Sequence, residues 1–369
     1  MRLVFWQNCL SPHQLPYIVK LMDDERVDEV VVAAGEAVND VRAKMGWETG
    51  RYAGIERCKV YVDLSDEQIE SLLRERVAES VHLFSGIRGF AFVFKSLKAS
   101  LAHPVRRCLI TERPNTFAFG RANGKPLWMH AIRFLLQDRA YARHIDTVFA
   151  MGGEAVEYFR SVYKKWRVVP FMYCTQSTEY RPTTMLRGAA KFIFIGGLSY
   201  RKAPTAIANA FAQIKKEGSR IDGTVTFVGD GDQRGKTEAV FRKNGMDDIA
   251  EFVGYRPMRE IPTWLAKSDV LILPSVYDGW GAVVNEALQM GLYVICSDAC
   301  GASDLIRGDE GLGTVFKKGD EGGLASAIDY CMSHIDEVRS GRGYRMQWAD
   351  SHISGDVVAR YMIDCLCGK

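Results

Sequence analysis

Residues 271–291 read LILPSVYDGWGAVVNEALQMG, and the order of their parts is the clearest fold signal in the chain. An apolar run is followed by a turn that contains Asp278, Gly279 and Gly281, and then by a helical pattern that holds Glu286. Glycines let the backbone approach a ligand closely and present N–H groups at the start of a helix. The segment therefore predicts a strand, a ligand-binding turn and a helix of an α/β domain.

The two carboxylates of this segment suit a shared task. Asp278 stands at the start of the expected helix and Glu286 on its second turn, so both can face one cleft. A carboxylate pair is suited to vicinal hydroxyls, such as those of ribose and of a hexose ring. The alternative is a turn with a capping Asp and a solvated Glu, which the segment taken alone would favour.

Short apolar runs alternate with amphipathic stretches on both sides of this segment, which indicates parallel sheets covered on both faces. The expected strands are residues 2–6, 29–33, 59–62, 80–84, 107–111, 146–150 and 167–170, then 191–195, 223–228, 250–253, 270–273, 293–296 and 313–316. The clearest helical patterns are residues 65–79, 126–143, 202–216, 258–267, 281–290 and 320–331, with a last helix at about 354–365.

The length of 369 residues suits two domains rather than one. We predict two Rossmann-like domains, residues 1–172 and 173–350, whose parallel sheets face each other across a cleft. A polar linker is expected near residues 174–188, and residues 351–369 should form a C-terminal helix that packs back toward the N-terminal domain. Ligands of such sheets bind at the carboxyl ends of the strands.

Composition excludes several classes of function. The net charge is +3, no run of 18 apolar residues predicts a transmembrane helix, and the N-terminus reads as a first strand rather than a signal peptide. Nine scattered cysteines indicate reduced, mostly buried thiols in a cytoplasmic protein. No recognised nucleic-acid-binding module is present, so nucleic acid is not an expected partner.

Residues 271–291 resemble the donor-site motif of family 4 glycosyltransferases, which has a Glu, seven residues and a second Glu, with Gly-aromatic-Gly after the first. The resemblance covers about residues 190–330, through the strings FIGGLSYRKAP, FVGDGDQ, FVGYRP, SDACGASDLI and GTVFKKGDEGGLASAI. The first half matches in layout only. The resemblance implies the two-domain GT-B fold, a nucleotide-sugar donor bound by the C-terminal domain, and an acceptor on the side of the N-terminal domain.

The resemblance also implies roles for individual residues. Lys202 meets the donor diphosphate, Asp278 the donor sugar and Glu286 the ribose. Two positions depart from the family: Asp278 is one methylene shorter than the usual Glu, and Gly197 replaces an Arg of the phosphate turn. We assign Arg201 as the substitute for that Arg; a solvated surface Arg is the alternative. The remaining expected donor-site residues are Gly197, Gly229, Tyr255, Arg256, Gly279, Trp280, Gly281, Ala282 and Gly301.

Three residues of the first half are candidates for the acceptor or sugar side. His13 follows the first expected strand, in a loop that faces the cleft; a surface His at a helix start is the alternative. Glu112 and Arg113 follow the strand at residues 107–111, where the family often has a donor-contacting His. A salt-bridged surface pair is the alternative for these two, and we weigh the two interpretations evenly.

No metal and no cofactor are expected. The charge that develops on a nucleoside diphosphate leaving group can be stabilised by Lys202, Arg201 and helix N-termini. The sequence Asp230-Gly231-Asp232 spells the Asp-x-Asp of metal-binding transferases, but here it is expected to form a tight turn after a strand. The pairs Cys296/Cys300 and Cys365/Cys367 lack the spacing of a zinc site.

Residues 87–107, IRGFAFVFKSLKASLAHPVRR, combine aromatic and basic side chains. Such a helix can lie on an anionic membrane surface, which would make the cytoplasmic protein peripheral at the inner face of the membrane. The alternative is a core-facing helix with a solvated basic rim. Both stay open, because acceptors in the resembled family are often lipid-linked.

Together these observations predict a retaining, metal-independent glycosyltransferase. It would move a sugar from a nucleotide-diphosphate sugar, with a UDP-sugar favoured over a GDP-sugar, to a glycan or lipid-linked acceptor in surface polysaccharide or glycolipid synthesis. Two alternatives are a two-Rossmann nucleotide-sugar epimerase and a non-catalytic protein that binds sugar nucleotides.

Overall fold

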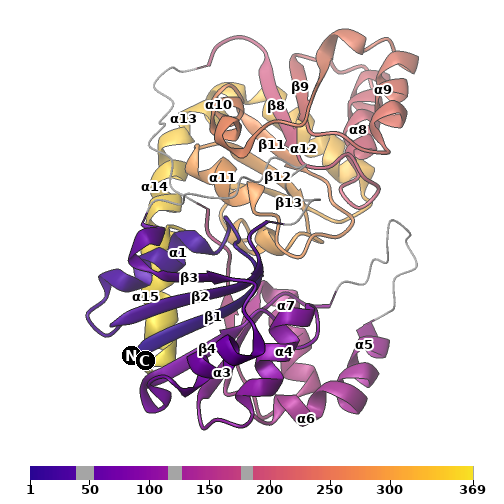
Figure 1. Ribbon diagram of the computed structural model, residues 1–369. Coiled ribbons are helices and arrows are strands. Elements are labelled where there is room, and N and C mark those ends of the chain that lie inside the picture. The colour runs from indigo at the N-terminus through magenta and orange to yellow at the C-terminus, as the bar shows by residue number, and fades with distance from the viewer. Residues whose placement is uncertain (39–53, 115–126, 176–185, 369) are drawn as a thin grey trace.

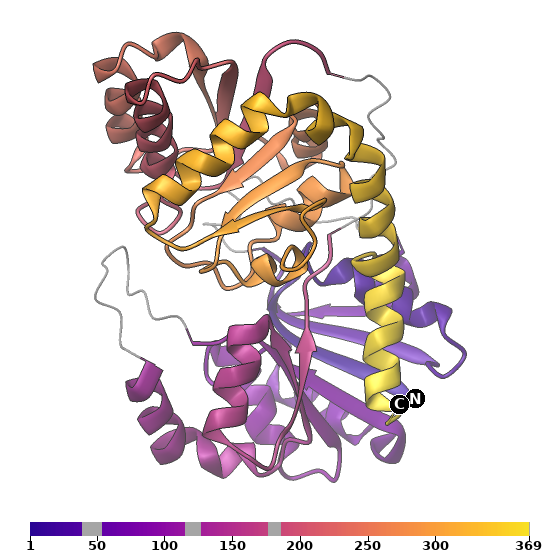
Figure 2. The same cartoon turned by 180° about the vertical axis from the view of Figure 1, so that it is seen from behind.

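The computed structural model describes residues 1–38, 54–114, 127–175 and 186–368. Two α/β domains stack on each other, each with a central sheet and helices on both faces (Figure 1). In the view from behind, the C-terminal helix of the chain runs down from the second domain along the first (Figure 2). The predicted pair of Rossmann-like domains with parallel sheets is therefore confirmed.

The first domain holds a seven-stranded sheet in the order β3-β2-β1-β4-β5-β6-β7, with every neighbouring pair parallel. Its strands are β1 (Arg2–Cys9), β2 (Glu29–Glu36), β3 (Lys59–Val62), β4 (Ser80–Phe84), β5 (Arg106–Thr111), β6 (Thr147–Met151) and β7 (Arg167–Phe171). Its α-helices are α1 (Leu15–Lys20), α3 (Asp66–Arg74), α4 (Ala91–Ser100), α5 (Leu127–Arg133), α6 (Arg139–Ala142) and α7 (Gly153–Val162).

The second domain holds a six-stranded sheet in the order β10-β9-β8-β11-β12-β13, also parallel. Its strands are β8 (Ala190–Ile195), β9 (Gly223–Val228), β10 (Ala250–Gly254), β11 (Val270–Leu273), β12 (Tyr293–Ser297) and β13 (Gly313–Phe316). Its α-helices are α8 (Pro204–Lys216), α9 (Arg234–Lys243), α10 (Ile261–Ala266), α11 (Val283–Gln289), α12 (Glu321–Ser333), α13 (Ile335–Ser340) and α14 (Arg342–His352), after which α15 (Gly355–Leu366) returns to the first domain.

Shorter helical turns connect these elements. Six of them are 3-10 helices: η1 (Leu21–Asp23), η2 (Ile55–Arg57), η3 (Val77–Glu79), η5 (Asp247–Ile249), η6 (Met258–Glu260) and η7 (Gly301–Leu305). A π-helical segment, η4 (Phe134–Asp138), separates α5 from α6. The stretch 126–143, expected as one helix, is thus interrupted, and its first residue lies outside the described residues, as do residues 176–185 of the expected linker.

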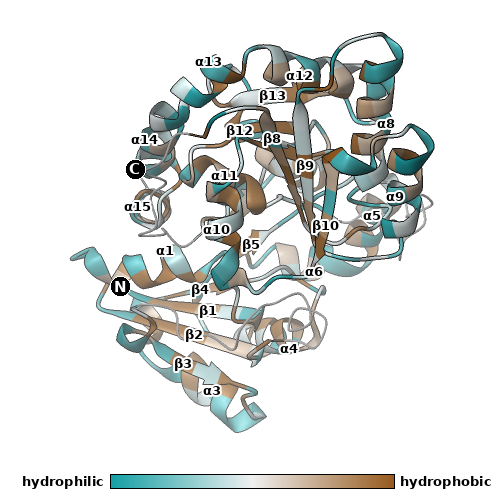
Figure 3. Cartoon of the chain, turned by 90° about the horizontal axis from the view of Figure 1, so that it is seen from above, coloured by the Kyte–Doolittle hydropathy of each residue, from teal (hydrophilic) through white to brown (hydrophobic). Residues whose placement is uncertain are grey.

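Continuous burial explains why the strands could be read from the sequence. All four residues of β11 and all five of β12 are buried, because helices cover both faces of the sheet. In Figure 3 the strands of both sheets carry mostly hydrophobic colours, and the outer turns of the helices hydrophilic ones. Among the described residues, no helix has both the length and the apolarity needed to cross a bilayer.

Helix α15 packs against the first domain. Val358, Met362 and Ile363 are buried in the same core cluster as β1 and β2. Arg106 and Arg167 of the first sheet donate to the carbonyls of Leu366 and Cys365, at 2.6 and 2.5 Å. These bonds join the end of the chain to the first domain, and both termini lie side by side there (Figures 1 and 2).

The chain leaving β7 also ties the domains together. Asn285 of α11 donates to the carbonyl of Tyr173 at 3.0 Å, and Gln289 donates to that of Thr175 at 3.2 Å. A further contact joins α7 of the first domain to η7 of the second, where Asp304 accepts a hydrogen bond from the N–H of Gly153 at 2.5 Å. Helix α11 of the second domain is therefore hydrogen-bonded directly to the segment that follows the first sheet.

The stretch 87–107 faces inward with most of its apolar side chains. Val93 and Leu97 of α4 are buried, and the Phe92 ring lies 6.1 Å from that of Trp6. Arg107 is also buried, and its Nη1 donates to the carbonyl of Val105 at 2.9 Å. The geometry thus follows the core-facing interpretation of this stretch, although Phe90 at its start is exposed.

Candidate active site

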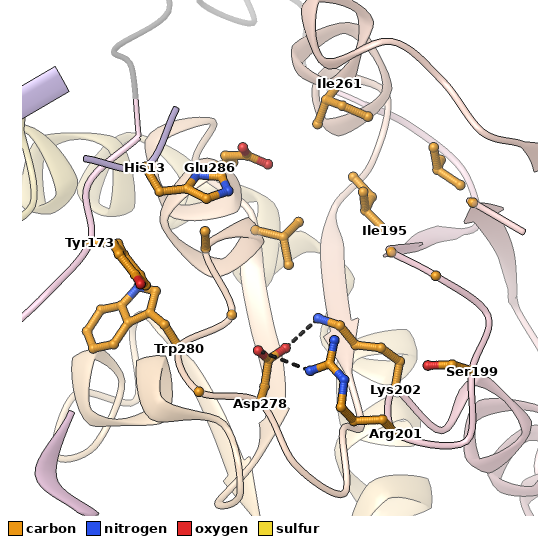
Figure 4. A pocket seen from close by; sticks show the side chains of 18 of the residues that line it. His13, Tyr173, Ile195, Ser199, Arg201, Lys202, Ile261, Asp278, Trp280 and Glu286 are labelled. Atoms are coloured by element: carbon orange, nitrogen blue, oxygen red, sulfur yellow. Dashed lines mark hydrogen bonds and ion pairs between the residues drawn. The ribbon is translucent and has the colours of Figure 1, made fainter. Parts of the chain in front are cut away.

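A cavity of about 730 Å³ lies between the two domains, at the carboxyl ends of strands from both sheets (Figure 4). The second domain contributes the turns that follow β8, β9, β10 and β11, and the first contributes the loops after β1, β5 and β7. Its wall contains fifteen of the sixteen predicted site residues: His13, Glu112, Arg113, Gly197, Arg201, Lys202, Gly229, Tyr255, Arg256, Asp278, Gly279, Trp280, Gly281, Ala282 and Glu286.

An ion-pair cluster stands at the centre of the wall. Lys202 binds Oδ2 of Asp278, and Nη1 of Arg201 lies 3.5 Å from Oδ1 of the same carboxylate (Figure 4). Arg201 also donates to the carbonyl of Tyr277 at 3.1 Å. Burial acts to raise the pKa of Asp278, but the charges of Lys202 and Arg201 outweigh it and hold that pKa below its ordinary value. Two cations from the turn after β8 thus meet one carboxylate from the turn after β11.

Glu286 is a carboxylate of a different kind. It lies on α11, lines the cavity and is partly buried. Burial raises the pKa of its carboxyl from 4.5 to about 7. A buried carboxyl without a cationic partner favours its neutral form, so its charge is costly until a donor of hydrogen bonds enters the cavity.

Glycines of the turn after β11 permit contacts with which a side chain would collide. Gly281 has a φ of 94°, and a side chain there would come within 2.5 Å of Sγ of Cys300. A side chain at Gly301 would collide with the carbonyl of Gly279, so Gly301, the one predicted residue outside the cavity wall, packs behind the turn. The backbone pairs across this contact: Ala302 donates to the carbonyl of Trp280 at 2.8 Å.

Trp280 is a buried part of the wall. Its Nε1 donates to Oδ1 of Asn285 at 2.8 Å, and its ring meets that of Tyr173 edge to face, with centroids 6.4 Å apart. Only 3% of Trp280 is exposed, so the ring shapes the cavity rather than standing free in it. Tyr173 was not predicted; its position at the carboxyl end of β7 was the available signal.

Glu112 crosses the gap between the domains. A side chain at Gly279 would collide with Oε2 of Glu112, so this carboxylate lies directly against the turn after β11. Burial, and secondarily the charge and hydrogen bonding of Glu112, raise the pKa of Tyr173 well above its ordinary value. Glu112 therefore contacts the second domain.

Arg113 and His13 complete the wall on the first domain. Arg113 binds Oε2 of Glu154 at 2.6 Å, and its guanidinium stacks over the Tyr277 ring at 4.9 Å. The His13 ring lies 6.2 Å from that of Tyr173. Both residues line the cavity. Tyr277 also lines it and was not predicted from the sequence; its ring contacts the Arg113 guanidinium, and its carbonyl accepts a hydrogen bond from Arg201.

The turns after β8, β9 and β10 contact one another where they line the cavity. A side chain at Gly229 would collide with the carbonyl of Gly196. The Tyr255 hydroxyl donates to the carbonyl of Asp230 at 2.8 Å, and the Arg256 guanidinium lies 5.4 Å above the Trp264 ring. Tyr255 is nearly half exposed, which leaves its ring accessible to a ligand in the cavity.

The Asp-x-Asp string forms a turn. Asp230 accepts the N–H of Gly231 at 2.8 Å and pairs with Arg234 at 3.2 Å, while Asp232 accepts from Gln233 at 2.9 Å. Each carboxylate is thus engaged by its own neighbours. Within the described ranges, no group of three His, Cys, Asp or Glu side chains is arranged to hold a metal ion.

Comparison with known proteins finds a family model that matches most of the second domain. Residues 189–334 match the family model of Glycosyl transferases group 1. The chain is 28% identical over 173 residues to the 2-deoxystreptamine glucosyltransferase of Streptomyces kanamyceticus, covering 46% of this chain and 44% of the relative. It is 24% identical over 144 residues to the amylovoran biosynthesis glycosyltransferase of Erwinia amylovora, covering 37% and 35%. The chain thus matches less than half the length of these relatives.

Solved structures share the whole fold. The structure of HepE from Anabaena in complex with UDP covers 100% of both chains with a TM-score of 0.70 at 14% identity. Sucrose-phosphate synthase from Thermosynechococcus elongatus covers 100% of this chain and 99% of its own, with a TM-score of 0.67 at 15% identity. At this level of identity the likeness concerns the fold, which is the GT-B arrangement expected from the sequence.

Proposed function

We propose that this chain, whose residues 189–334 match the family model of Glycosyl transferases group 1, transfers a sugar from a nucleotide-diphosphate sugar to a glycan or lipid-linked acceptor. The observation that carries the proposal is the cavity between the domains. It combines two cations, two carboxylates of opposite character and a glycine turn on the side that matches the family. The relative named for amylovoran biosynthesis supports a role in polysaccharide synthesis, and the relative named as a 2-deoxystreptamine glucosyltransferase supports sugar transfer in general.

The donor would bind to the second domain. Tyr255, Arg256 and Gly229 line the end of the cavity where we place the base, and Glu286 accepts hydrogen bonds from the ribose hydroxyls. The diphosphate lies beside Lys202 and Arg201, and Asp278 meets the donor sugar. Because HepE was solved with UDP, we favour a UDP-sugar over a GDP-sugar.

Departure of the nucleoside diphosphate would be assisted by protein charge. When the bond between the anomeric carbon and the diphosphate oxygen breaks, negative charge grows on that oxygen. Lys202 and Arg201 line the cavity and can stabilise this charge. Asp230 and Asp232 already have other partners, which supports a transfer that needs no metal ion. We propose retention of configuration, and assign no side chain as a covalent nucleophile.

The acceptor would enter from the first domain. His13, Glu112 and Arg113 form that side of the wall. Glu112 lies against Gly279 of the turn after β11, and this contact supports a position near the meeting point of the acceptor hydroxyl and the donor sugar. We propose that Glu112 and His13 orient the acceptor, with Arg113 held in place by Glu154.

A thermal-shift panel of UDP-, GDP- and ADP-sugars tests donor binding. A ligand at about 100 times its dissociation constant should add about 2.7 kcal/mol to the free energy of unfolding. The stabilising donor is then incubated with the protein and with candidate acceptors, and the anomeric configuration of the product is read by NMR. Free nucleoside diphosphate together with a retained glycoside supports the proposal; an epimerised nucleotide sugar, or binding without turnover, would support one of the two alternatives.

A further inference from the structure

A helical segment at the edge of the first domain exposes an unusual amount of apolar surface. It consists of α5, η4 and α6, and it projects from the rim of the domain in both views (Figures 1 and 2). The exposed fractions are 62% for Trp128, 47% for Ile132, 51% for Leu135 and 80% for Leu136. Exposed apolar patches of this kind mark an interaction surface more often than a free protein face.

The segment is fixed to the domain by its opposite side. Phe134 is buried, and its ring meets that of Trp166 edge to face at 5.3 Å. Arg88 reaches over from the loop before α4, binds the Asp138 carboxylate and donates to the carbonyl of Gln137 at 2.6 Å. The exposed side chains therefore stand on a well-anchored helix, so their exposure is a property of the fold.

Charge identifies the partner that this face suits. Arg133, Arg139 and Arg143 are exposed along the same segment. The sequence from 127 to 143 contains one acidic residue, Asp138, which Arg88 neutralises. A helical face that joins Trp and Leu to arginines suits the boundary of an anionic lipid bilayer, where apolar side chains enter the acyl region and arginines meet phosphates. A protein partner of ordinary polarity would not require this basic excess.

The other face of the same segment lines a second cavity. This cavity, of about 590 Å³, includes His130, Arg133 and Phe134 in its wall, and it shares Glu112 and Tyr173 with the donor cavity. A surface that docks through Trp128 and Leu136 would therefore bring the entrance to the acceptor side close to lipid.

We propose that the segment from α5 to α6 docks on an anionic lipid bilayer and that the second cavity receives the head group of a lipid-linked acceptor held in that bilayer. The docking step stands on the exposed face alone. The acceptor step rests on the proposed glycosyltransferase function. Residues 87–107 supply Arg88 as an anchor, while the apolar contact with lipid comes from residues 128–136.

Sedimentation with vesicles tests the docking step. The full chain is mixed with vesicles of phosphatidylcholine alone or with 30% phosphatidylglycerol, at low and at 0.5 M salt. We expect binding to the anionic vesicles, weakened by salt. The double change Arg139→Gln and Arg143→Gln should weaken it about fivefold for each arginine, and Trp128→Ser with Leu136→Ser should weaken it at least tenfold.

Matched variants on the same domain control the test. Val62 is 42% exposed on β3, and the Arg74 side chain is 74% exposed. Val62→Ser and Arg74→Gln should leave vesicle binding unchanged. Equal loss in these controls, or no preference for anionic vesicles, would overturn the docking proposal. So would a concentration-dependent dimer that Leu136→Ser abolishes, because the face would then bind a second copy.

Donor binding separates this inference from the proposed function. Thermal shifts by the preferred sugar nucleotide should be the same in all these variants and in the wild type, which also shows that each variant folds. If the wild type binds anionic vesicles but no sugar nucleotide, the docking step stands and the proposed function fails. If it binds the donor but no vesicle, the docking step fails and donor binding by the proposed function stands. If it binds both and transfers to water-soluble glycans as fast as to vesicle-embedded lipid acceptors, the acceptor step fails.

Discussion

Replacing Glu286 by Gln should stabilise the protein and at the same time weaken its ligand. Burial raises the pKa of Glu286 from 4.5 to about 7, so the folded protein holds a proton that the unfolded chain releases. A group whose folded pKa is raised contributes stability that is complete below about pH 4.5 and is lost as the pH rises through 7. The loss at pH 8 is at most roughly 3 kcal/mol.

Gln cannot ionise, so the variant escapes this loss. At pH 8 its ligand-free form should be more stable than the wild type by up to roughly 3 kcal/mol, and at pH 5 by less than about 1 kcal/mol. For a domain of this size the larger figure corresponds to an increase of several degrees in Tm. Thermal unfolding between pH 5 and 8 measures the difference. The exposed Glu310→Gln should show no such pH-dependent gain.

The same change should weaken nucleotide binding, because an amide must turn one of its two acceptors into a donor when it meets two ribose hydroxyls. With a pKa of about 7, Glu286 is mostly ionised at pH 8 and mostly protonated at pH 6, so the wild type should bind UDP about tenfold more weakly at pH 6. The Gln variant is the control: because Gln does not titrate, the pH dependence of its UDP affinity, measured by calorimetry, comes from protonation of UDP. If wild type and variant share one pH profile for both stability and binding, Glu286 is not the group that we describe.

Three further predictions follow from the proposed site. Lys202→Ala should lower kcat/KM about ten- to hundredfold, which steady-state kinetics would measure, because it removes a charge-assisted bond to the diphosphate; wild-type kinetics would remove Lys202 from the mechanism. Asp278→Asn should weaken the sugar nucleotide in calorimetry more than the free nucleotide; equal weakening of both would show that Asp278 does not meet the sugar. Dialysis against EDTA should leave turnover unchanged, whereas a loss that only Mg²⁺ or Mn²⁺ restores would implicate Asp230 and Asp232 as ligands.

The strands were predictable because their burial is written into consecutive apolar residues. Five of the expected ranges coincide with β3, β4, β9, β11 and β13. The edge strand β3 is the exception to burial, because all four of its residues are exposed, and its β-branched and aromatic residues Val60, Tyr61 and Val62 indicated the strand instead. Helices with few buried residues were not predictable in the same way. Helix α9 buries Thr237 and Phe241, and α14 buries Arg345 and Ala349, so neither carries a clear apolar stripe. The break at Phe134–Asp138 was also hidden, because a π-helical turn changes the spacing without changing the composition.

The cavity could be predicted on the side where one domain forms it from its own turns. Lys202 follows β8, and Asp278 and Glu286 follow the neighbouring strand β11 of the same sheet, so the topology brings them together. Contacts between the two domains depend on the relative orientation of the domains, and no local sequence pattern predicts them. Glu112 against Gly279 and Tyr173 against Trp280 are both of this kind.

The departure of Asp278 from the expected Glu becomes intelligible from the partners that it holds. Its backbone is fixed by a hydrogen bond to the carbonyl of Ala299 at 3.0 Å, so a longer side chain would carry the carboxylate farther into the cavity and away from Lys202. With Gly197 in place of an arginine, Lys202 and Arg201 are the cations beside this carboxylate, and it neutralises part of their charge.

An incoming diphosphate would compete for the same two cations. As they turn to the phosphates, Asp278 is released toward the donor sugar, whose hydroxyls can then take their place as hydrogen-bond donors. The two proposed roles of Asp278, counter-ion without the donor and sugar ligand with it, thus follow from one geometry. Asp278→Asn removes both roles at once, whereas Asp278→Glu keeps the charge and moves only its position. If the placement beside Lys202 is what matters, the Glu variant should lose turnover even though it restores the residue that the family uses.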